Sequence, residues 1–229
     1  MAILLGSTNL TNFRVGTQTP DRIFLGNDLV WPDFAPATTQ FEYTSSGAVQ
    51  GFNIPMNCRR LDLIAIGGGG GGQGSGCCAV NGFGGGAGTW DAMILVRGVD
   101  IPWSLTQICV VVGVGGPGGT GLGGAIPGLP GGGGGNTSWY QGPNTSSTEI
   151  LRGEMGLGGL GGIIGANVAG ASSPAFTFNG ITYPGGTGGN SSGQAGGVPG
   201  AGGAGATGGI FIGSSGGKGG NGRAYVRAY

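Results

Sequence analysis

The stretch Leu61-Asp62-Leu63-Ile64-Ala65-Ile66-Gly67-Gly68-Gly69-Gly70-Gly71-Gly72 joins the two kinds of structure that we expect in this chain. Its first six residues are mostly apolar on both faces, which predicts a strand in the centre of a β-sandwich rather than at an exposed edge. Six glycines follow directly, and they offer no side chains to a hydrophobic core. The glycine-rich part of the fold must therefore be stabilised by other means.

Glycine accounts for 62 of the 229 residues, and all but five of these glycines follow Ile66. Collagen is excluded, because Gly196-Gly197-Val198-Pro199-Gly200-Ala201-Gly202-Gly203 loses the three-residue register within eight residues. Disorder is an alternative, but apolar strands recur after the glycine tracts. Ordering the backbone costs roughly 1–2 kcal/mol per residue, and glycine loses the most freedom. Ordered tracts therefore need dense hydrogen bonding between closely packed chain segments.

An extended left-handed helix with three residues per turn meets this need, because it leaves every amide and carbonyl pointing outward. In triplets such as Gly185-Gly186-Thr187, two glycine rows can face neighbouring helices while the third row faces outward. We therefore predict an all-β fold with sandwich-like strands, an inserted polyglycine-II helical bundle, a short N-terminal β-repeat and essentially no α-helix. Irregular ordered loops are the alternative for the tracts.

The remaining strands are predicted from runs rich in β-branched and aromatic residues that are bounded by turn residues. They are Phe41 to Thr44, Val49 to Ile54, Arg60 to Ile66, Thr89 to Val96, Gln107 to Val114, Phe176 to Tyr183 and Arg223 to Tyr229. Trp31-Pro32-Asp33-Phe34-Ala35-Pro36 is predicted to be a linker, because its prolines disfavour strand pairing. The chain thus divides into an attachment segment, residues 1–36, and a glycine-rich domain, residues 37–229.

Residues 1–34 contain a repeat with a period of ten: Leu5-Gly6-Ser7, Val15-Gly16-Thr17 and Leu25-Gly26-Asn27. Each unit predicts one brief strand and one turn. A segment of this size is too small to enclose a core, so we expect it to pack on the rest of the chain, on copies of itself or on a partner. A small β-meander without an attachment role is the alternative. The predicted attachment residues are Leu5, Phe13, Val15, Ile23, Leu25 and Trp31.

The side-chain chemistry argues against an enzyme. Nine basic and nine acidic residues cancel, and histidine is absent. The chain therefore lacks the usual general acid–base residue and zinc ligand, and its carboxylates are too scattered to share an ion. Gly113-Val114-Gly115-Gly116-Pro117-Gly118 matches a dinucleotide loop in spacing only, because a helix cannot begin there. We expect no metal, no cofactor and no nucleic-acid partner.

The sequence has no basic, apolar leader and no run long enough to span a membrane, so we expect synthesis in a cytoplasm without membrane insertion. Cys58, Cys77, Cys78 and Cys109 match no zinc-site spacing. They are either buried free thiols or, if the protein works outside a cell, Cys58 or Cys109 is bonded to the Cys77–Cys78 loop.

Two groups of motifs carry a family resemblance. Leu5-Gly6-Ser7-Thr8 and Phe24-Leu25-Gly26-Asn27-Asp28-Leu29-Val30-Trp31-Pro32 resemble the N-terminal repeat of minor tail proteins from actinobacteriophages. Gly84-Gly85-Gly86-Ala87-Gly88-Thr89-Trp90 and Gly219-Gly220-Asn221-Gly222-Arg223-Ala224-Tyr225-Val226 resemble the glycine-rich domain of phage tail proteins, and the tracts are similar to those of tail-fibre tip adhesins.

This resemblance implies a virion tail-tip protein that binds the host cell surface without catalysis, or else a passive structural component that joins other virion proteins. It implies other phage tail proteins as partners, and a homotrimer because fibre and tip proteins are often trimeric.

For the adhesin, the candidate ligand-binding residues are aromatics and amides that we expect to be exposed in two loop candidates: Trp139, Tyr140, Gln141, Asn144, Phe176, Phe178 and Tyr183. Aromatic faces beside amide donors suit flat sugar rings, so a host cell-envelope glycan is the expected ligand. Alternatively, these aromatics cap the ends of the glycine lattice or fill a subunit interface.

Overall fold

The structure, a computed structural model, describes residues 4–5, 8–9, 17–18, 20, 22–31, 39–56 and 58–229. These residues form strands, turns and extended segments without any helix, as predicted, so none of them belongs to a membrane-spanning helix. The strands are β1 (Leu4–Leu5), β2 (Thr8–Asn9), β3 (Ile23–Leu25), β4 (Asp28–Trp31), β5 (Thr39–Tyr43), β6 (Val49–Asn53), β7 (Arg60–Ile66), β8 (Trp90–Val96), β9 (Gln107–Val111), β10 (Thr137–Tyr140), β11 (Glu149–Gly153), β12 (Phe176–Phe178), β13 (Ile181–Tyr183) and β14 (Arg223–Ala228).

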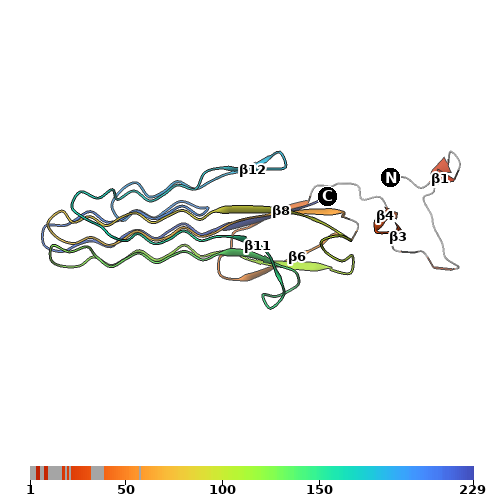
Figure 1. Ribbon diagram of the computed structural model, residues 1–229, viewed down its shortest axis with the longest axis horizontal. Coiled ribbons are helices and arrows are strands. Elements are labelled where there is room, and N and C mark those ends of the chain that lie inside the picture. The colour runs from red at the N-terminus through yellow and green to blue at the C-terminus, as the bar shows by residue number, and fades with distance from the viewer. Residues whose placement is uncertain are drawn as a thin grey trace.

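Two four-stranded sheets form a sandwich, and the glycine-rich segments extend from one end of it (Figure 1). The strand orders are β5-β14-β7-β8 and β11-β10-β9-β6, and every pair is antiparallel. Strand β7 lies between β14 and β8, and Leu61 to Ile66 are fully buried. The prediction of a central strand is therefore confirmed.

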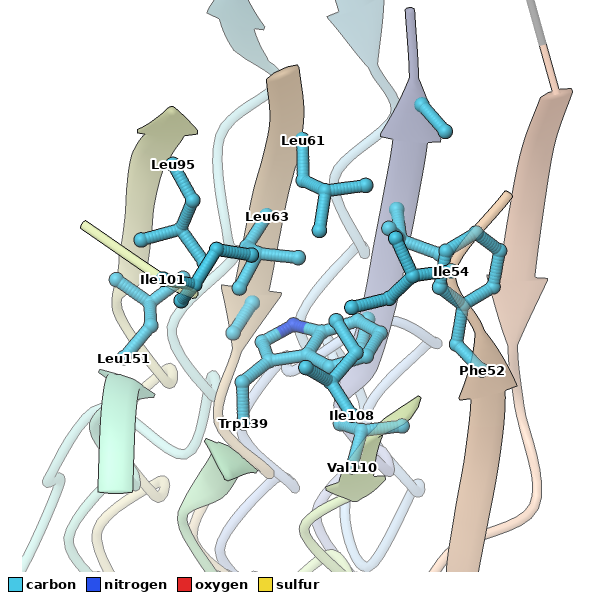
Figure 2. Close-up of a cluster of buried hydrophobic side chains, with 14 of the residues drawn as sticks. Phe52, Ile54, Leu61, Leu63, Leu95, Ile101, Ile108, Val110, Trp139 and Leu151 are labelled. Carbon is cyan, nitrogen blue, oxygen red and sulfur yellow. The ribbon is translucent and has the colours of Figure 1, made fainter. Parts of the chain in front are cut away.

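The hydrophobic core lies between the two sheets, with Trp139 near its centre (Figure 2). Its indole is fully buried, and Nε1 donates to the carbonyl of Ile64 across the sandwich at 3.2 Å. The surrounding side chains include Phe52, Leu61, Leu63, Leu95, Ile108, Val110, Leu151 and Val226. Burying one such large side chain contributes about 1.5–3 kcal/mol, so this cluster stabilises the sandwich.

A smaller cluster covers the outer face of the β5-β14-β7-β8 sheet. The hairpin β12–β13 lies against Ile64 and Tyr225, and its Phe176 stacks on Trp90 with ring centroids 5.5 Å apart. Figure 1 shows this hairpin on the side of the sandwich away from β6. The outer face of β7 is therefore covered as well, which is why the strand is apolar on both faces.

Strand β7 continues without a break into residues 67–77, which are all buried. Successive amides of this segment donate in rotation to three tracts at N···O distances of 2.8 to 3.0 Å. Gly68, Gly71 and Gly74 donate to residues 129–135. Gly69, Gly72 and Ser75 donate to residues 214–220, and Gly70 and Gln73 donate to residues 83–86. All three acceptor tracts run antiparallel to residues 67–77, which we call the central segment.

The carbonyls of the same segment accept from three other tracts in the same rotation, at 2.8 to 3.1 Å. The donors are residues 116–122, 156–159 and 203–209, and each of these tracts runs parallel to the central segment. A hydrogen-bonding partner that recurs every third residue fits a left-handed helix with three residues per turn. The predicted polyglycine-II bundle is therefore present as a lattice in which one helix has six bonded neighbours.

The lattice leaves no space for a side chain at its central glycines. A Cβ atom at Gly70 would lie 1.9 Å from the carbonyl oxygen of Leu157, and one at Gly72 would lie 1.9 Å from that of Ala204. The obstacles are backbone atoms, which cannot rotate away. A Cβ atom at Gly115 would likewise collide with the carbonyl oxygen of Gly219. Gly115 belongs to the sequence that matches a dinucleotide loop only in spacing.

Gln73 shows how the lattice accommodates a longer side chain at a buried position. Its Oε1 accepts from the amide of Gly162 at 2.8 Å, and its Nε2 donates to the carbonyl of Gly128 at 3.0 Å. The amides of Gly156 and Gly159 donate to backbone carbonyls of the central segment, whereas the amide of Gly162 donates to the Gln73 side chain. The glutamine amide thus takes the place of a peptide group.

The N-terminal repeat forms two hairpins, β1–β2 and β3–β4. Phe24 of β3 packs edge-on against Trp103 with ring centroids 5.1 Å apart, and Arg22 donates to the carbonyl of Trp103 at 3.3 Å. This hairpin therefore contacts the glycine-rich part of the chain. Phe13, Val15 and the linker residues 32–36 lie outside the described residues, so the division near residue 36 stays a prediction.

Two strands were missed by the sequence analysis. Residues 137–140 and 149–153 were not predicted as strands, yet they form the hairpin β10–β11 that continues the second sheet. Glycine and asparagine flank the short run Thr137-Ser138-Trp139-Tyr140, which is typical of a loop, but pairing with β9 overrides that local signal. Strand β9 also ends at Val111 rather than Val114.

Candidate binding surface at the end of the lattice

Several turns that connect the lattice helices gather at the end farthest from the sandwich (Figure 1). Four of these turns are bonded to one another around residues 77–80. Cys77 donates to Gly124 and Cys78 donates to Gly209, both at 2.8 Å, while Asn81 donates to Ile163 at 3.1 Å. We call these four turns, residues 77–80, 123–127, 160–166 and 207–213, the tip.

The tip exposes large apolar side chains. Their exposed fractions are Ile126 56%, Ile163 61%, Ile164 72%, Ile210 81%, Phe211 84% and Ile212 72%. Leu160 and Leu157 lie three and six residues before Ile163, so with three residues per turn they form one outward row that leads to the tip. Grouped apolar exposure of this kind is typical of an interaction site.

The tip carries no charge. The sequence has no Asp, Glu, Lys or Arg from residue 63 to 90, from 101 to 148 or from 155 to 217. A hollow of about 480 Å³ lies between three of the turns and is lined by Cys78, Val80, Ala125, Pro127, Gly162, Ile163 and Ile164. The surface therefore suits an apolar or neutral partner rather than an ionic one.

The structure places the predicted ligand-binding residues in two separate regions. Trp139 and Tyr183 are buried, with exposed fractions of 0% and 2%, so the expectation that these two aromatics are exposed is wrong. Trp139 lies between the sheets, whereas Tyr183 lies on the opposite face of the β5-β14-β7-β8 sheet. The alternation of a strand, rather than a loop, turns Trp139 inward.

Phe176 and Phe178 are half-buried and stack on one another with centroids 6.3 Å apart. Together with Trp90 they hold the hairpin β12–β13 on the sheet. These two aromatics therefore pack on the outer face of the sheet, which differs from both expected roles, a ligand site and a cap of the lattice ends.

The other predicted residues lie around the β10–β11 connection. Gln141 lines a hollow of about 470 Å³ beside Asp100, Ile101 and Glu149. Arg152 donates to Glu149 and holds the pKa of that carboxyl below its usual value, so the carboxylate is ionised and its charge is balanced by the guanidinium. Asn144 is exposed, but its Oδ1 accepts from Ser146 N at 3.1 Å within the turn. Tyr140 is half-buried in β10.

Among the predicted attachment residues, Ile23 is half-buried and Leu25 is 74% exposed on the hairpin β3–β4. Leu5 and Trp31 belong to β1 and β4. Within the described part of the chain, no group of His, Cys, Asp or Glu side chains could hold a metal ion.

The tip was not predicted from the sequence. Ile163-Ile164 and Ile210-Phe211-Ile212 are short apolar runs between glycines, and such runs could have been recognised as turns of the predicted bundle.

Comparisons with known proteins identify a family and two relatives of this chain. The chain belongs to the glycine-rich domain family, which it matches over residues 44–229. It is 38% identical to the Gene 32 protein of Mycobacterium phage L5 over 232 residues, which is 99% of either chain. It is also 39% identical to the Gene 32 protein of Mycobacterium phage D29 over 170 residues, or 74% of this chain and 59% of that relative. The chain is thus a phage protein with a glycine-rich domain.

Proposed function

We propose that this chain is a minor tail protein of the virion and that its tip contacts the host cell surface. The main support for this proposal is the tip, whose turns are uncharged and expose large apolar side chains. These turns lie at the end of a lattice that has almost no side-chain core. A lattice of backbone hydrogen bonds holds these turns in fixed places, and preorganised loops lose less entropy on binding. The relationship to phage proteins supports a role in a virion.

The N-terminal segment is the proposed attachment end. The hairpin β3–β4 contacts Trp103 at the sandwich, and Figure 1 shows the sandwich at the opposite end from the tip. Contacts with other tail proteins at this end leave the tip free to face outward. A trimeric assembly stays part of the proposal, and light scattering of the purified protein measures its copy number.

An adsorption experiment tests the function. Labelled full-length protein is added to bare host cells, and the same cells are then challenged with phage. We expect the protein to bind and to reduce infection. A protein that binds only purified tail components, and leaves infection unchanged, would establish the passive structural role instead.

Matched variants locate the contact. Phe211→Ser changes the most exposed aromatic of the tip, and we expect it to weaken cell binding roughly tenfold, the loss typical of an aromatic anchor. Val99→Ser is the control, because Val99 is 75% exposed but follows β8 at the sandwich. Equal binding by both variants and the unmodified chain would rule out the tip as the contact.

A glycan ligand at the β10–β11 connection is the second candidate. Gln141 supplies an amide beside Asp100 and Glu149 in a hollow of about 470 Å³, which suits hydroxyl groups. Gln141→Ala would then weaken binding while Phe211→Ser would not. The two variants therefore separate the two surfaces.

A further inference from the structure

The cysteine turn at the centre of the tip holds two adjacent thiols against each other. The Sγ atoms of Cys77 and Cys78 lie 2.7 Å apart. Cys77 is buried, whereas Cys78 is exposed and lines the hollow of the tip. The separation is close to the roughly 2.05 Å of a disulfide bond, so little movement is needed to join the sulfurs.

Neighbouring cysteines are seldom placed this way. Their Cα atoms lie about 3.8 Å apart across a trans peptide, less than the usual 4.4 Å or more in a disulfide. Joining them requires an unusual backbone, and this turn has one: φ is 60° at Cys78, about a bond within the ring that the disulfide would close, and such a value is uncommon outside glycine.

The lattice, rather than the sulfur atoms, fixes this backbone. The amides of Cys77 and Cys78 are bonded to two other turns of the tip, and the amide of Val80 donates to the carbonyl of Cys77 at 3.2 Å. Val80 also forms a bridge with Ile164 in a third turn. The thiols are therefore held together by contacts that do not depend on a bond between them.

We propose that Cys77 and Cys78 form a vicinal disulfide once the protein meets an oxidising environment. The oxidant is a small-molecule disulfide such as oxidised glutathione. The thiolate of Cys78 attacks it and releases one small thiol; the sulfur of Cys77 then attacks Cys78 and releases the second. One S–S bond forms and one breaks, the two protons leave on the released thiols, and the two electrons reduce the oxidant.

The order of attack follows from the environment of each sulfur. Hydrogen bonding to Cys78, with burial, raises the pKa of Cys77, and Cys77 is shielded from an incoming oxidant. Cys78 faces solvent and is the accessible nucleophile. The resulting ring stiffens the turn that holds the other tip turns together. This inference concerns the bond alone and does not rest on the proposed function.

Cys58 and Cys109 provide an internal reference. Both are free and fully buried in the sandwich, and burial raises the pKa of each. They are therefore expected to stay reduced under the same conditions. Trypsin separates the two classes of cysteine, because cleavage after Arg60 and Arg97 leaves Cys77 and Cys78 alone on one peptide.

Thiol counting with mass spectrometry tests the proposal. The folded full-length protein is incubated with oxidised glutathione, then denatured and alkylated with or without prior reduction. We expect two alkyl groups per chain without reduction and four with it, and an unlabelled 61–97 peptide that is two hydrogens lighter than its reduced form. Four alkyl groups without reduction, a glutathione adduct retained on Cys78, or a bond to another peptide would each overturn the proposal.

Two single variants check the assignment. Cys109→Ser should give one alkyl group without reduction and three after it, because the vicinal pair is intact. Cys78→Ser should not form an internal bond. It should give three alkyl groups after reduction, and without reduction either three or two with a glutathione adduct on Cys77 that the peptide mass identifies. An internal disulfide that persists in Cys78→Ser would show that Cys77 pairs elsewhere, and the unmodified chain gives the answer even if this variant fails to fold.

Discussion

The sandwich and the lattice use opposite means of stabilisation, although one segment of chain runs through both. Residues 61–66 bury large side chains between and outside the sheets. Residues 67–77 are just as buried but contact their neighbours mainly through backbone hydrogen bonds. In the sandwich a side chain fills space, whereas in the lattice its absence allows the backbones to approach.

This difference changes what each region tolerates. A hydrophobic core accepts substitutions that conserve volume, because side chains can repack. The lattice has no side chains to repack at positions such as Gly70, where the neighbouring atoms belong to the backbone. Substitutions in each region therefore measure how far the two regions differ.

The largest effect is expected in the sandwich. Trp139→Ala removes a fully buried indole and its hydrogen bond to Ile64, which should lower the free energy of unfolding by about 3–5 kcal/mol. Chemical denaturation measures the loss. Val99→Ala, at an exposed site, should change stability by less than about 0.5 kcal/mol. A Trp139→Ala protein as stable as the Val99→Ala protein would contradict the described core.

A single methyl group should be almost as harmful in the lattice. Gly70→Ala places a Cβ 1.9 Å from the carbonyl oxygen of Leu157, and we expect a loss of about 3 kcal/mol. Gly123→Ala makes the same chemical change where nothing lies within 4 Å. It should be nearly neutral. Similar denaturation midpoints for the two variants would show that the lattice is looser than described.

The glutamine in the lattice should have an intermediate effect. Gln73→Met keeps most of the volume but leaves the amide of Gly162 and the carbonyl of Gly128 without their partner, at a cost of about 2 kcal/mol. Gln50→Met is the control, since Gln50 is half-exposed and water can replace its bond to Ser45. Amide exchange at Gly162 should accelerate only in the Gln73 variant; unchanged exchange there would refute the assigned bond.

The smallest effect concerns pH. With no histidine, stability should vary by less than about 0.5 kcal/mol between pH 5 and 8. Burial raises the pKa of Tyr225 and Tyr183 above 10.0. A raised folded-state pKa means that the stabilisation is fully present below pH 10 and is lost as the pH rises through the folded value.

Denaturation at a series of pH values checks this profile. Tyr225→Phe removes one titrating group, so its stability should fall less steeply on the alkaline side. A marked change between pH 6 and 7 would contradict the flat profile near neutral pH, whereas an unaltered alkaline slope in the variant would argue against the burial of the Tyr225 phenol.

The central strand β7 and the glycine lattice were predicted from the sequence, whereas two other strands were not. Leu61 to Ile66 are apolar on both faces, and a double-sided strand could be recognised from that run alone. The glycine triplets predicted helices that pair laterally. Strands β10 and β11 could not be recognised, because their pairing with β9 depends on residues far away in sequence.

The binding surface was less predictable than the fold. Tyr140, Gln141 and Asn144 lie near the surface, but Trp139 is in the core because the strand turns it inward. Short apolar runs such as Ile210-Phe211-Ile212 give no local sign of exposure. Their exposure follows from where the lattice helices end.

The sequence by itself determined the all-β class, the glycine lattice and the lack of charge at the tip, because these follow from residue type and spacing. Only the tertiary structure decided which helix lies at the centre with six neighbours, which aromatics are buried and that the thiols of Cys77 and Cys78 touch. The reason is physical: glycine tracts are chemically alike, so hydrogen bonds between distant segments, rather than local preference, choose each partner.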